Sequence, residues 1–261
     1  MDLNADLGEQ GVGGFENDAL ILKYVTSANI ACGGHAGTLQ TMMLCLGEAK
    51  RLNVTVGAHL SYPDLANFGR VTMSISDNAL HASLTAQLQE LIFAAREQNV
   101  VVRYVKPHGA LYHDSKNLGV ANILCDVMAN SMGMVDGSGV SIPLALLVAP
   151  GNPVDRVASR FQIPVYREGF LDRGYQPDGT LMPRNLEGAV ITDSATILRR
   201  ASAFAEQQPV AAHSGELLHM NVDSVCVHSD TPKAAVFAKL AHTSITKSVG
   251  SPRSFLPELF S

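Results

Sequence analysis

Residues 144–149 read Leu-Ala-Leu-Leu-Val-Ala, and this short apolar run indicates the fold class. Its length suits a strand better than a helix, because buried strands usually span about 4–8 residues and helices at least about ten. A strand without a polar residue on either face is typical of a parallel sheet that helices cover on both sides. We therefore expect an α/β fold with a parallel sheet at its centre.

The segments on either side of this run alternate between short apolar stretches and longer helical ones. We predict seven strands, at residues 2–6, 28–32, 55–59, 101–107, 144–149, 165–168 and 224–227. The predicted helices cover residues 39–52, 76–98, 118–132, 153–160 and 194–207, and a last one begins near residue 232. This alternation favours parallel β-sheet, either closed into a barrel or open and doubly wound. No linker or internal repeat is recognisable, so we predict a single domain over residues 1–261.

Composition narrows the function classes. Of the 261 residues, 46% are hydrophobic and 16% are charged, which is typical of a protein with a large core. The net charge of −5 and the lack of a basic run argue against nucleic acid as a partner. No apolar stretch approaches the ~20 residues of a membrane span, and no signal peptide is recognisable, so we expect a cytoplasmic protein without a membrane partner. The four cysteines form no C-x-x-C pair and are expected to be reduced and buried: Cys32, Cys45, Cys125 and Cys226.

Ionisable side chains follow the predicted strands at the end where each strand stops. Because the carboxyl ends of parallel strands meet at one side of the sheet, six of the seven strands would deliver such groups to a single ligand-binding mouth. Histidines and carboxylates are costly to bury together without a purpose. The residues that we expect to be catalytic are Asp6, His35, His59, Lys106 and His108. The residues that we expect to bind substrate are Asn4, Glu9, Tyr112, Glu168, Asp172, Arg173, His228 and Asp230.

Lys106 stands inside an apolar strand and must face a partner or a cavity. Three interpretations are open. It binds a carboxylate or phosphate of the substrate, it acts as a base with a depressed pKa, or it forms a structural ion pair with Asp6 or Glu168. The phosphate-loop pattern G-x-x-x-x-G-K-[ST] and the nucleophile-elbow pattern G-x-S-x-G are absent from the sequence.

Several blocks of the sequence resemble the LamB/YcsF family. They are Asp-Leu-Asn-Ala-Asp-Leu-Gly-Glu at 2–9, Ser-Ala-Asn-Ile-Ala-Cys-Gly-Gly-His-Ala-Gly at 27–37, Gly-Ala-His-Leu-Ser-Tyr-Pro-Asp at 57–64, Val-Lys-Pro-His-Gly-Ala-Leu-Tyr at 105–112 and Glu-Gly-Phe-Leu-Asp-Arg-Gly-Tyr at 168–175, with Gly179, Leu181 and Arg184 beyond. The resemblance runs from residue 2 to about residue 250, in the family's order and spacing.

This resemblance implies a seven-stranded, somewhat irregular (β/α) TIM-like barrel, related to glycoside hydrolases and polysaccharide deacetylases. It also implies the A subunit of an ATP-hydrolysing 5-oxoprolinase, which acts together with the partner subunits B and C. That reaction opens the lactam of 5-oxo-L-proline to L-glutamate, with ATP as co-substrate. Whether ATP binds this chain or a partner, and whether a divalent cation takes part, remain open at this point.

Two other functions are compatible with the residues. A metal-dependent, deacetylase-like hydrolase acting alone would hold a divalent ion on Asp6 and His59, with a position left for water. A non-catalytic scaffold would use the same groups only to bind a small molecule.

The chain also departs from the family pattern. Asp, Pro, Arg and Gly are usual where Thr38, Leu60, Val71 and Ser229 stand. Thr38 is still expected to cap the helix that follows it.

Overall fold

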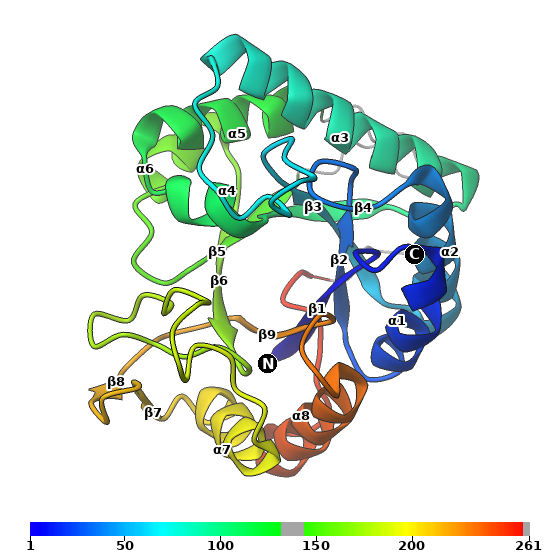
Figure 1. The fold of residues 1–261 in the computed structure, drawn as a ribbon. Helices are drawn as coiled ribbons and strands as arrows, with labels where there is room; N and C mark the ends of the chain where they lie inside the picture. The colour runs from blue at the N-terminus through cyan, green and yellow to red at the C-terminus, as the bar shows by residue number, and fades with distance from the viewer. Residues whose placement is uncertain (132–143, 258–261) are drawn as a thin grey trace.

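The computed structural model describes residues 1–131 and 144–257, and the strands in them form a closed parallel barrel (Figure 1). Around the barrel the order is β1 (Asp2–Leu7), β2 (Ser27–Ala31), β3 (Thr55–Leu60), β4 (Val102–Pro107), β5 (Ala145–Val148), β6 (Val165–Phe170) and β9 (Ser224–His228). β9 pairs in parallel with β1 and closes the ring. The predicted TIM-like α/β barrel is therefore confirmed, and the open doubly wound alternative is wrong.

Helices surround this barrel, as Figure 1 shows. Those in the described residues are α1 (Phe15–Leu22), α2 (Leu39–Leu52), α3 (Asp77–Glu97), α4 (Gly109–Asp114), α5 (Leu118–Asn130), α6 (Asp155–Ala158), α7 (Ser194–Ala205) and α8 (Ala234–Val249). 3₁₀ turns lie at Val12–Gly14 and Ser159–Phe161, and β7 (Val210–Ala211) pairs antiparallel with β8 (Leu217–Leu218). The sequence did not predict α1 and α4, because both are too short for a clear helical period. The predicted end of the helix at residue 132 lies outside the described residues.

Side-chain caps set the beginnings of two predicted helices. The Thr38 hydroxyl accepts a hydrogen bond from the Thr41 backbone N–H, and the Thr41 hydroxyl caps the backbone of Thr38 in return. The Ser76 hydroxyl accepts from Ala79 N–H in the same way. Such caps satisfy backbone donors that the first helical turn leaves unpaired. Thr38 thus retains the capping role expected of it.

The barrel separates two kinds of interior. In β1, Leu3, Ala5 and Leu7 belong to the apolar core between strands and helices, because alternate residues of a strand point to opposite sides. Asp2 and Asn4 point the other way, into the barrel, where Asn4 donates to Ser224 Oγ at 2.7 Å. Layers of aliphatic side chains usually fill the inside of a TIM barrel, so a polar interior directs attention to the barrel itself.

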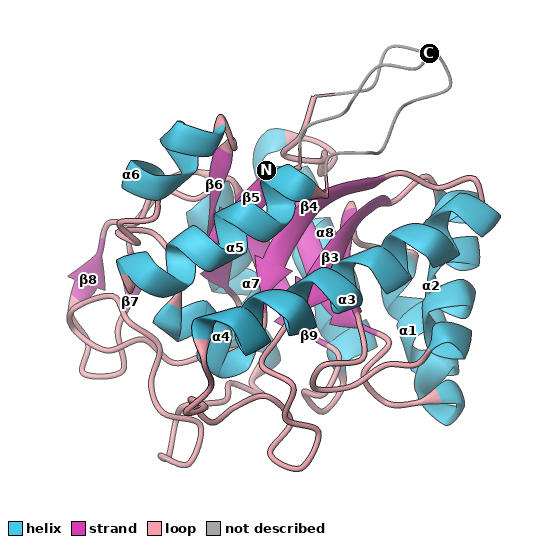
Figure 2. Ribbon diagram, turned by 90° about the horizontal axis from the view of Figure 1, so that it is seen from above, coloured by secondary structure: helices cyan, strands magenta, loops and turns pink. Residues whose placement is uncertain are grey.

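The amino-terminal end of the barrel is closed by the chain's own last described segment. Phe255 and Leu256 pack on Tyr104 and Leu147, and the Arg253 N–H donates to the carbonyl of Met1 at 3.0 Å. Most long loops gather at the opposite end of the strands (Figure 2). In the part of the chain that the structure describes, the polar interior opens into a cavity at the carboxyl ends of the strands.

The cysteines and the helices of the described residues bear on two expectations drawn from composition. The four cysteines are buried and free. None of the described helices has the length and apolar character that a bilayer crossing requires.

Candidate active site

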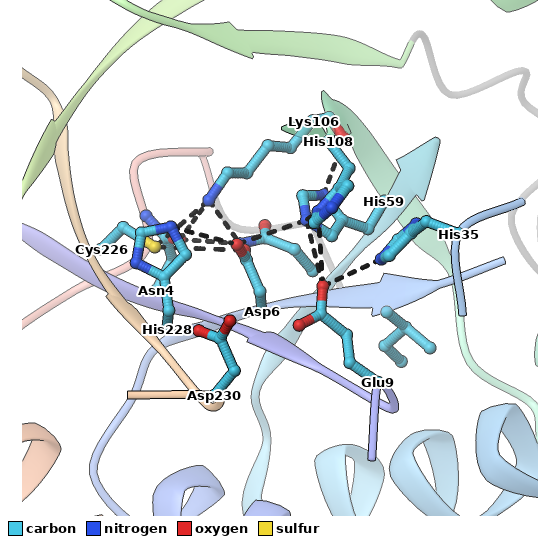
Figure 3. A network of polar contacts seen from close by, with 12 residues as sticks. Asn4, Asp6, Glu9, His35, His59, Lys106, His108, Cys226, His228 and Asp230 are labelled. Atoms are coloured by element: carbon cyan, nitrogen blue, oxygen red, sulfur yellow. Dashed lines mark hydrogen bonds and ion pairs between the residues drawn. The ribbon is translucent and has the colours of Figure 1, made fainter. Parts of the chain in front are cut away.

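Lys106 of β4 is the centre of a buried ion network inside the barrel (Figure 3). Its Nζ lies 2.7 Å from Asp6 Oδ1 and 2.8 Å from Glu168 Oε1. Burial opposes the ammonium charge, but Asp6 foremost and Glu168 as well outweigh burial and hold the pKa of Lys106 well above its ordinary value. This contradicts the interpretation of Lys106 as a base with a depressed pKa and supports the structural ion pair.

Asp6 of β1 is held from several sides. Its Oδ1 also accepts a hydrogen bond from Asn29 Nδ2 at 2.7 Å, while its Oδ2 lies 3.3 Å from His59 Nε2. Burial opposes ionisation, but His59 and Lys106 outweigh it, so the pKa of Asp6 lies well below its usual value. Sequence reasoning missed Asn29, although a polar residue in the middle of an apolar strand was the signal that could have revealed it.

Three imidazoles surround the carboxylate of Glu9, on the other side of Asp6 (Figure 3). Glu9 Oε1 lies 2.9 Å from His35 Nε2, 3.4 Å from His108 Nδ1 and 3.7 Å from His59 Nε2. Burial and the nearby charge of Asp6 raise the pKa of Glu9 to about 7. The site thus holds a carboxylate at the threshold of ionisation among buried histidines.

The rings of this cluster have a fixed arrangement. His35 and His108 stack with centroids 3.6 Å apart, and His59 is perpendicular to both. Burial lowers the pKa of His35 to about 3. Burial, followed by the neighbouring His35 and His59, holds the pKa of His108 well below its ordinary value. At neutral pH, His35 and His108 are therefore uncharged imidazoles.

A glycine contact places His108. Gly109 has φ 54°, and a Cβ there would lie 2.4 Å from the carbonyl oxygen of Gly69. Glycine therefore allows the loop at residues 68–70 to pack against the start of α4. This packing brings the carbonyl oxygen of Phe68 to 3.0 Å from His108 Nε2.

A second histidine–carboxylate unit lies across the barrel, at the ends of β6 and β9. Asp172 Oδ1 lies 2.8 Å from His228 Nδ1, and Asp172 Oδ2 accepts from Thr231 Oγ1 at 2.6 Å and from the His228 backbone N–H at 3.0 Å. Burial opposes ionisation of Asp172, but His228 outweighs it and lowers the pKa of Asp172. An ionised Asp172 accepts a hydrogen bond from His228 Nδ1–H, so the other ring nitrogen, Nε2, carries a lone pair and lies 3.8 Å from Asp6 Oδ2.

These groups open into a cavity of about 710 Å³ at the carboxyl ends of the strands. Asp6, His59, Lys106, His108 and His228 line its inner end. Such a volume suits a small metabolite with room for a second group.

The outer wall of the cavity is cationic, and sequence reasoning missed much of it. Arg70, Lys116 and Arg184 line it together with the predicted Arg173. Arg70 and Arg184 both pair with Asp230, Arg184 at 3.0 Å. These residues lie in loops and on helix flanks, where no periodic signal marks them.

Two predicted substrate-binding residues, Tyr112 and Arg173, differ in whether their polar groups already form hydrogen bonds. Tyr112 lines the cavity, and its buried hydroxyl has no hydrogen-bond partner among the described residues. The Arg173 guanidinium already donates to the carbonyls of Ala189 and Met182, at 3.1 and 2.6 Å. Tyr112 therefore brings a buried, unpaired hydroxyl to the cavity lining, whereas Arg173 holds its own loop in place.

The structure brings the predicted site residues to one end of the barrel, at different depths. Asp6, His59, Lys106, His108, Tyr112, Arg173 and His228 line the cavity. Glu9, His35, Glu168, Asp172 and Asp230 contact those residues from behind or beside them. Asn4 lies deeper, where it meets Asn29 and Ser224.

Three departures from the family pattern have distinct surroundings. Leu60 is fully buried, and its carbonyl accepts from the His108 N–H at 2.7 Å, a bond that a proline carbonyl would also accept. Val71 is exposed. The buried Ser229 hydroxyl has no hydrogen-bond partner among the described residues, and nothing in the structure explains this serine.

A closed parallel barrel with buried histidines and carboxylates at the carboxyl ends of its strands defines a TIM-like barrel protein with an enzyme-like site. Comparison with known proteins gives the particular family. The chain belongs to the LamB/YcsF family, whose model matches residues 1–256.

Individual relatives agree with this assignment. The chain is 38% identical over 261 residues to the A subunit of 5-oxoprolinase from Kocuria rhizophila, covering 98% of each chain. It superposes on the lactam utilization protein of Thermus thermophilus with a TM-score of 0.84 at 31% identity, covering 97% of this chain and 98% of that one. A GH20 catalytic module of a pneumococcal exo-β-D-N-acetylglucosaminidase shares the fold alone, with a TM-score of 0.52 at 8% identity over 95% of this chain and 82% of that one.

Proposed function

We propose that this chain is the lactam-handling A subunit of an ATP-dependent 5-oxoprolinase, which opens 5-oxo-L-proline to L-glutamate with the partner subunits B and C. The observation that carries the proposal is the cavity that joins the His228–Asp172 unit, Tyr112 and a cationic wall. The names of the Kocuria and Thermus relatives support the same activity. We further propose that residues 1–261 form one domain and act in the cytoplasm.

The chemistry explains the need for ATP. Resonance deactivates a lactam carbonyl toward water. Transfer of the γ-phosphoryl group to the carbonyl oxygen releases ADP and activates the carbon. Water then adds to that carbon, the C–N bond breaks, and the nitrogen takes up a proton to become the amine. The resulting γ-glutamyl phosphate reacts with a second water to give glutamate and inorganic phosphate.

His228 is suited to accept the proton of the attacking water. Its Nδ1 is engaged by Asp172 at 2.8 Å, so its Nε2 is free to act as a general base at the inner end of the cavity. The buried hydroxyl of Tyr112, in the cavity lining, would donate to an oxygen of the substrate if substrate binding uncovers it. His35, His59, His108 and Asp6 remain candidates for proton transfer, and Lys106 keeps the Asp6 carboxylate ionised.

The cationic wall is suited to an anionic substrate. Arg70, Lys116 and Arg184 surround the cavity, with Asp230 as counter-ion to the two arginines. 5-Oxoproline carries a carboxylate and its activated form a phosphoryl group, and guanidinium groups bind both in a bidentate manner.

Calorimetry of the isolated chain with millimolar ATP tests whether the nucleotide also binds to this chain. If no heat is released, ATP binds to one of the partner subunits.

Reconstitution tests the proposed function. The chain is mixed with candidate B and C subunits, 5-oxoproline and ATP, and glutamate and ADP are measured. The matched control replaces this chain with the Kocuria rhizophila relative, to establish that the B and C subunits are competent. Glutamate formation with both chains supports the proposal. Glutamate with the relative and none with this chain would refute it and favour a non-catalytic scaffold.

A stand-alone hydrolase with a metal on Asp6 and His59 is the second candidate. The ammonium group of Lys106, 2.7 Å from Asp6 Oδ1, opposes a cation at that carboxylate. Turnover of lactam by the chain alone, abolished by a chelator, would favour this candidate over the three-subunit enzyme.

A further inference from the structure

The backbone determines which nitrogen carries the proton in two histidines of the Glu9 cluster. His59 Nδ1 lies 3.0 Å from the carbonyl oxygen of Lys106, and His108 Nε2 lies 3.0 Å from that of Phe68. A carbonyl oxygen only accepts, so each of these nitrogens must donate a proton. In the neutral imidazoles, His59 Nε2 and His108 Nδ1 are therefore lone-pair acceptors.

These two acceptors face each other, and a third acceptor joins them. His59 Nε2 and His108 Nδ1 are 2.9 Å apart, and Glu9 Oε1 lies 3.7 and 3.4 Å from them. All three side chains are more than nine-tenths buried. Three converging lone pairs repel one another unless a proton or a metal ion lies between them.

We propose that His59 Nε2, His108 Nδ1 and the Glu9 carboxylate bind a divalent transition-metal ion. Metal-ligating histidines characteristically donate their other N–H to a backbone carbonyl or a carboxylate, which is what His59 and His108 do. Two nitrogens at about 2.1 Å from one ion and at right angles to each other would be about 3.0 Å apart. The observed 2.9 Å agrees with that arrangement.

His35 orients the site without being a ligand. Its ring is stacked on His108, with planes 4° apart, so one ion cannot lie in the planes of both rings. Its Nε2 lies 2.9 Å from Glu9 Oε1, the geometry of an N–H that donates to the carboxylate. The neutral tautomer then leaves His35 Nδ1 as an unpaired acceptor, which is less costly to bury than an unpaired donor.

The site differs from the Asp6–His59 pair expected from the sequence. Asp6 Oδ1 already accepts from Lys106 and Asn29, each at 2.7 Å, and the ammonium group repels a cation. The group of Asp6, Cys226 and His228 suffers from the same neighbour, because Lys106 Nζ is also 3.2 Å from Cys226 Sγ. Glu9, by contrast, forms no ion pair with a lysine or arginine of the described residues.

The ligand chemistry defines the class of ion. Two imidazoles and one carboxylate suit zinc, ferrous iron and cobalt, whereas magnesium and calcium prefer oxygen ligands. His59 and His108 line the cavity, so the coordination positions that the protein leaves open face the substrate space.

Metal titration of the untagged, chelator-treated chain tests the proposal. We expect one Zn²⁺ or Co²⁺ per chain by calorimetry, and a visible absorption band from bound Co²⁺. His59→Gln and Glu9→Gln should each weaken binding at least about 100-fold, and His35→Gln about 10-fold, as for the loss of an orienting partner. His113→Gln is the matched control, because His113 is an exposed histidine on the wall of the same cavity.

Two results would overturn the inference. One is the absence of stoichiometric binding, in which case a proton shared between His59 and His108 explains their contact. The other is binding that His59→Gln and His113→Gln weaken equally. Circular dichroism of each variant identifies any loss of fold, and the Co²⁺ band reports on ligands independently of affinity. The titration requires neither partner subunits nor 5-oxoproline, so its outcome is separate from that of the reconstitution.

Discussion

The ion network around Lys106 and the histidine cluster around Glu9 lie on opposite sides of Asp6, and each surrounds its buried carboxylates with different groups. On one side, Lys106 places an ammonium group between the carboxylates of Asp6 and Glu168, at 2.7 and 2.8 Å. On the other side, Glu9 has imidazoles around it, and its pKa rises to about 7 because of burial and the charge of Asp6. Asp6 and Glu168 have a structural counter-charge in Lys106. Glu9 has no lysine or arginine partner among the described residues, so its carboxylate remains able to bind a ligand.

The largest expected effect is the loss of stability when the ammonium group of Lys106 is removed. Lys106→Met leaves Asp6 and Glu168 buried without a counter-charge, and we expect the free energy of unfolding to fall by about 3–5 kcal/mol. Denaturant unfolding followed by circular dichroism measures this change. Lys116→Met is the control, since Lys116 is exposed at the cavity wall and should change stability by less than about 0.5 kcal/mol. Equal stability of both variants would show that the ion network is not what holds this side together.

The next largest expected effect is a loss of activity when Asp172 no longer orients His228. Asp172→Asn places an amide against His228 Nδ1 and favours the tautomer with its proton on Nε2, which is unable to accept one from water. We expect kcat of the reconstituted enzyme to fall about 1000-fold, or about 4 kcal/mol in activation free energy, with an altered pH profile. Asp126→Asn is the control, because it alters a histidine–carboxylate pair of similar length on the surface, where Asp126 lies 2.9 Å from His81, and it should leave kcat unchanged. An unchanged kcat in Asp172→Asn would remove His228 from the proposed mechanism.

Asp2 provides a smaller effect through a buried carboxylate that pairs with no lysine or arginine of the described residues and lies away from the Glu9 cluster. Burial raises its pKa from 3.8 to about 6, against the hydrogen bond from Ser224. The folded state therefore binds a proton more tightly than the unfolded state, and Asp2 lowers stability increasingly as pH rises through about 6. The stability of Asp2→Asn relative to wild type should rise by up to about 3 kcal/mol between about pH 4 and about pH 7.

Chemical denaturation at several pH values measures the Asp2 effect. Asp2→Asn and wild type are compared at each pH, so the titration of every other group common to the two proteins cancels in the difference. A constant difference between Asp2→Asn and wild type across this range would show that Asp2 is ionised in the folded protein as readily as in the unfolded one.

Local signals in the sequence were sufficient for much of the fold. The run at residues 144–149 predicted the buried strand β5 (Ala145–Val148), and Ser76 predicted the beginning of α3. These features depend on neighbours in the chain, such as apolar periodicity and hydroxyl caps. The short helix α4 has no clear helical period, and its position depends on the packing of Gly109 against Gly69, a contact between distant loops.

The sequence by itself determined which side chains arrive at the carboxyl ends of the strands, because strand direction and residue order decide this in any parallel α/β fold. Only the tertiary structure decided how they pair. That Lys106 contacts Asp6 and Glu168, while His59 and His108 turn their lone pairs toward Glu9, depends on barrel closure and on backbone carbonyls as acceptors. Pairing energies of this kind act over a few ångströms between segments distant in sequence, so no local pattern encodes them.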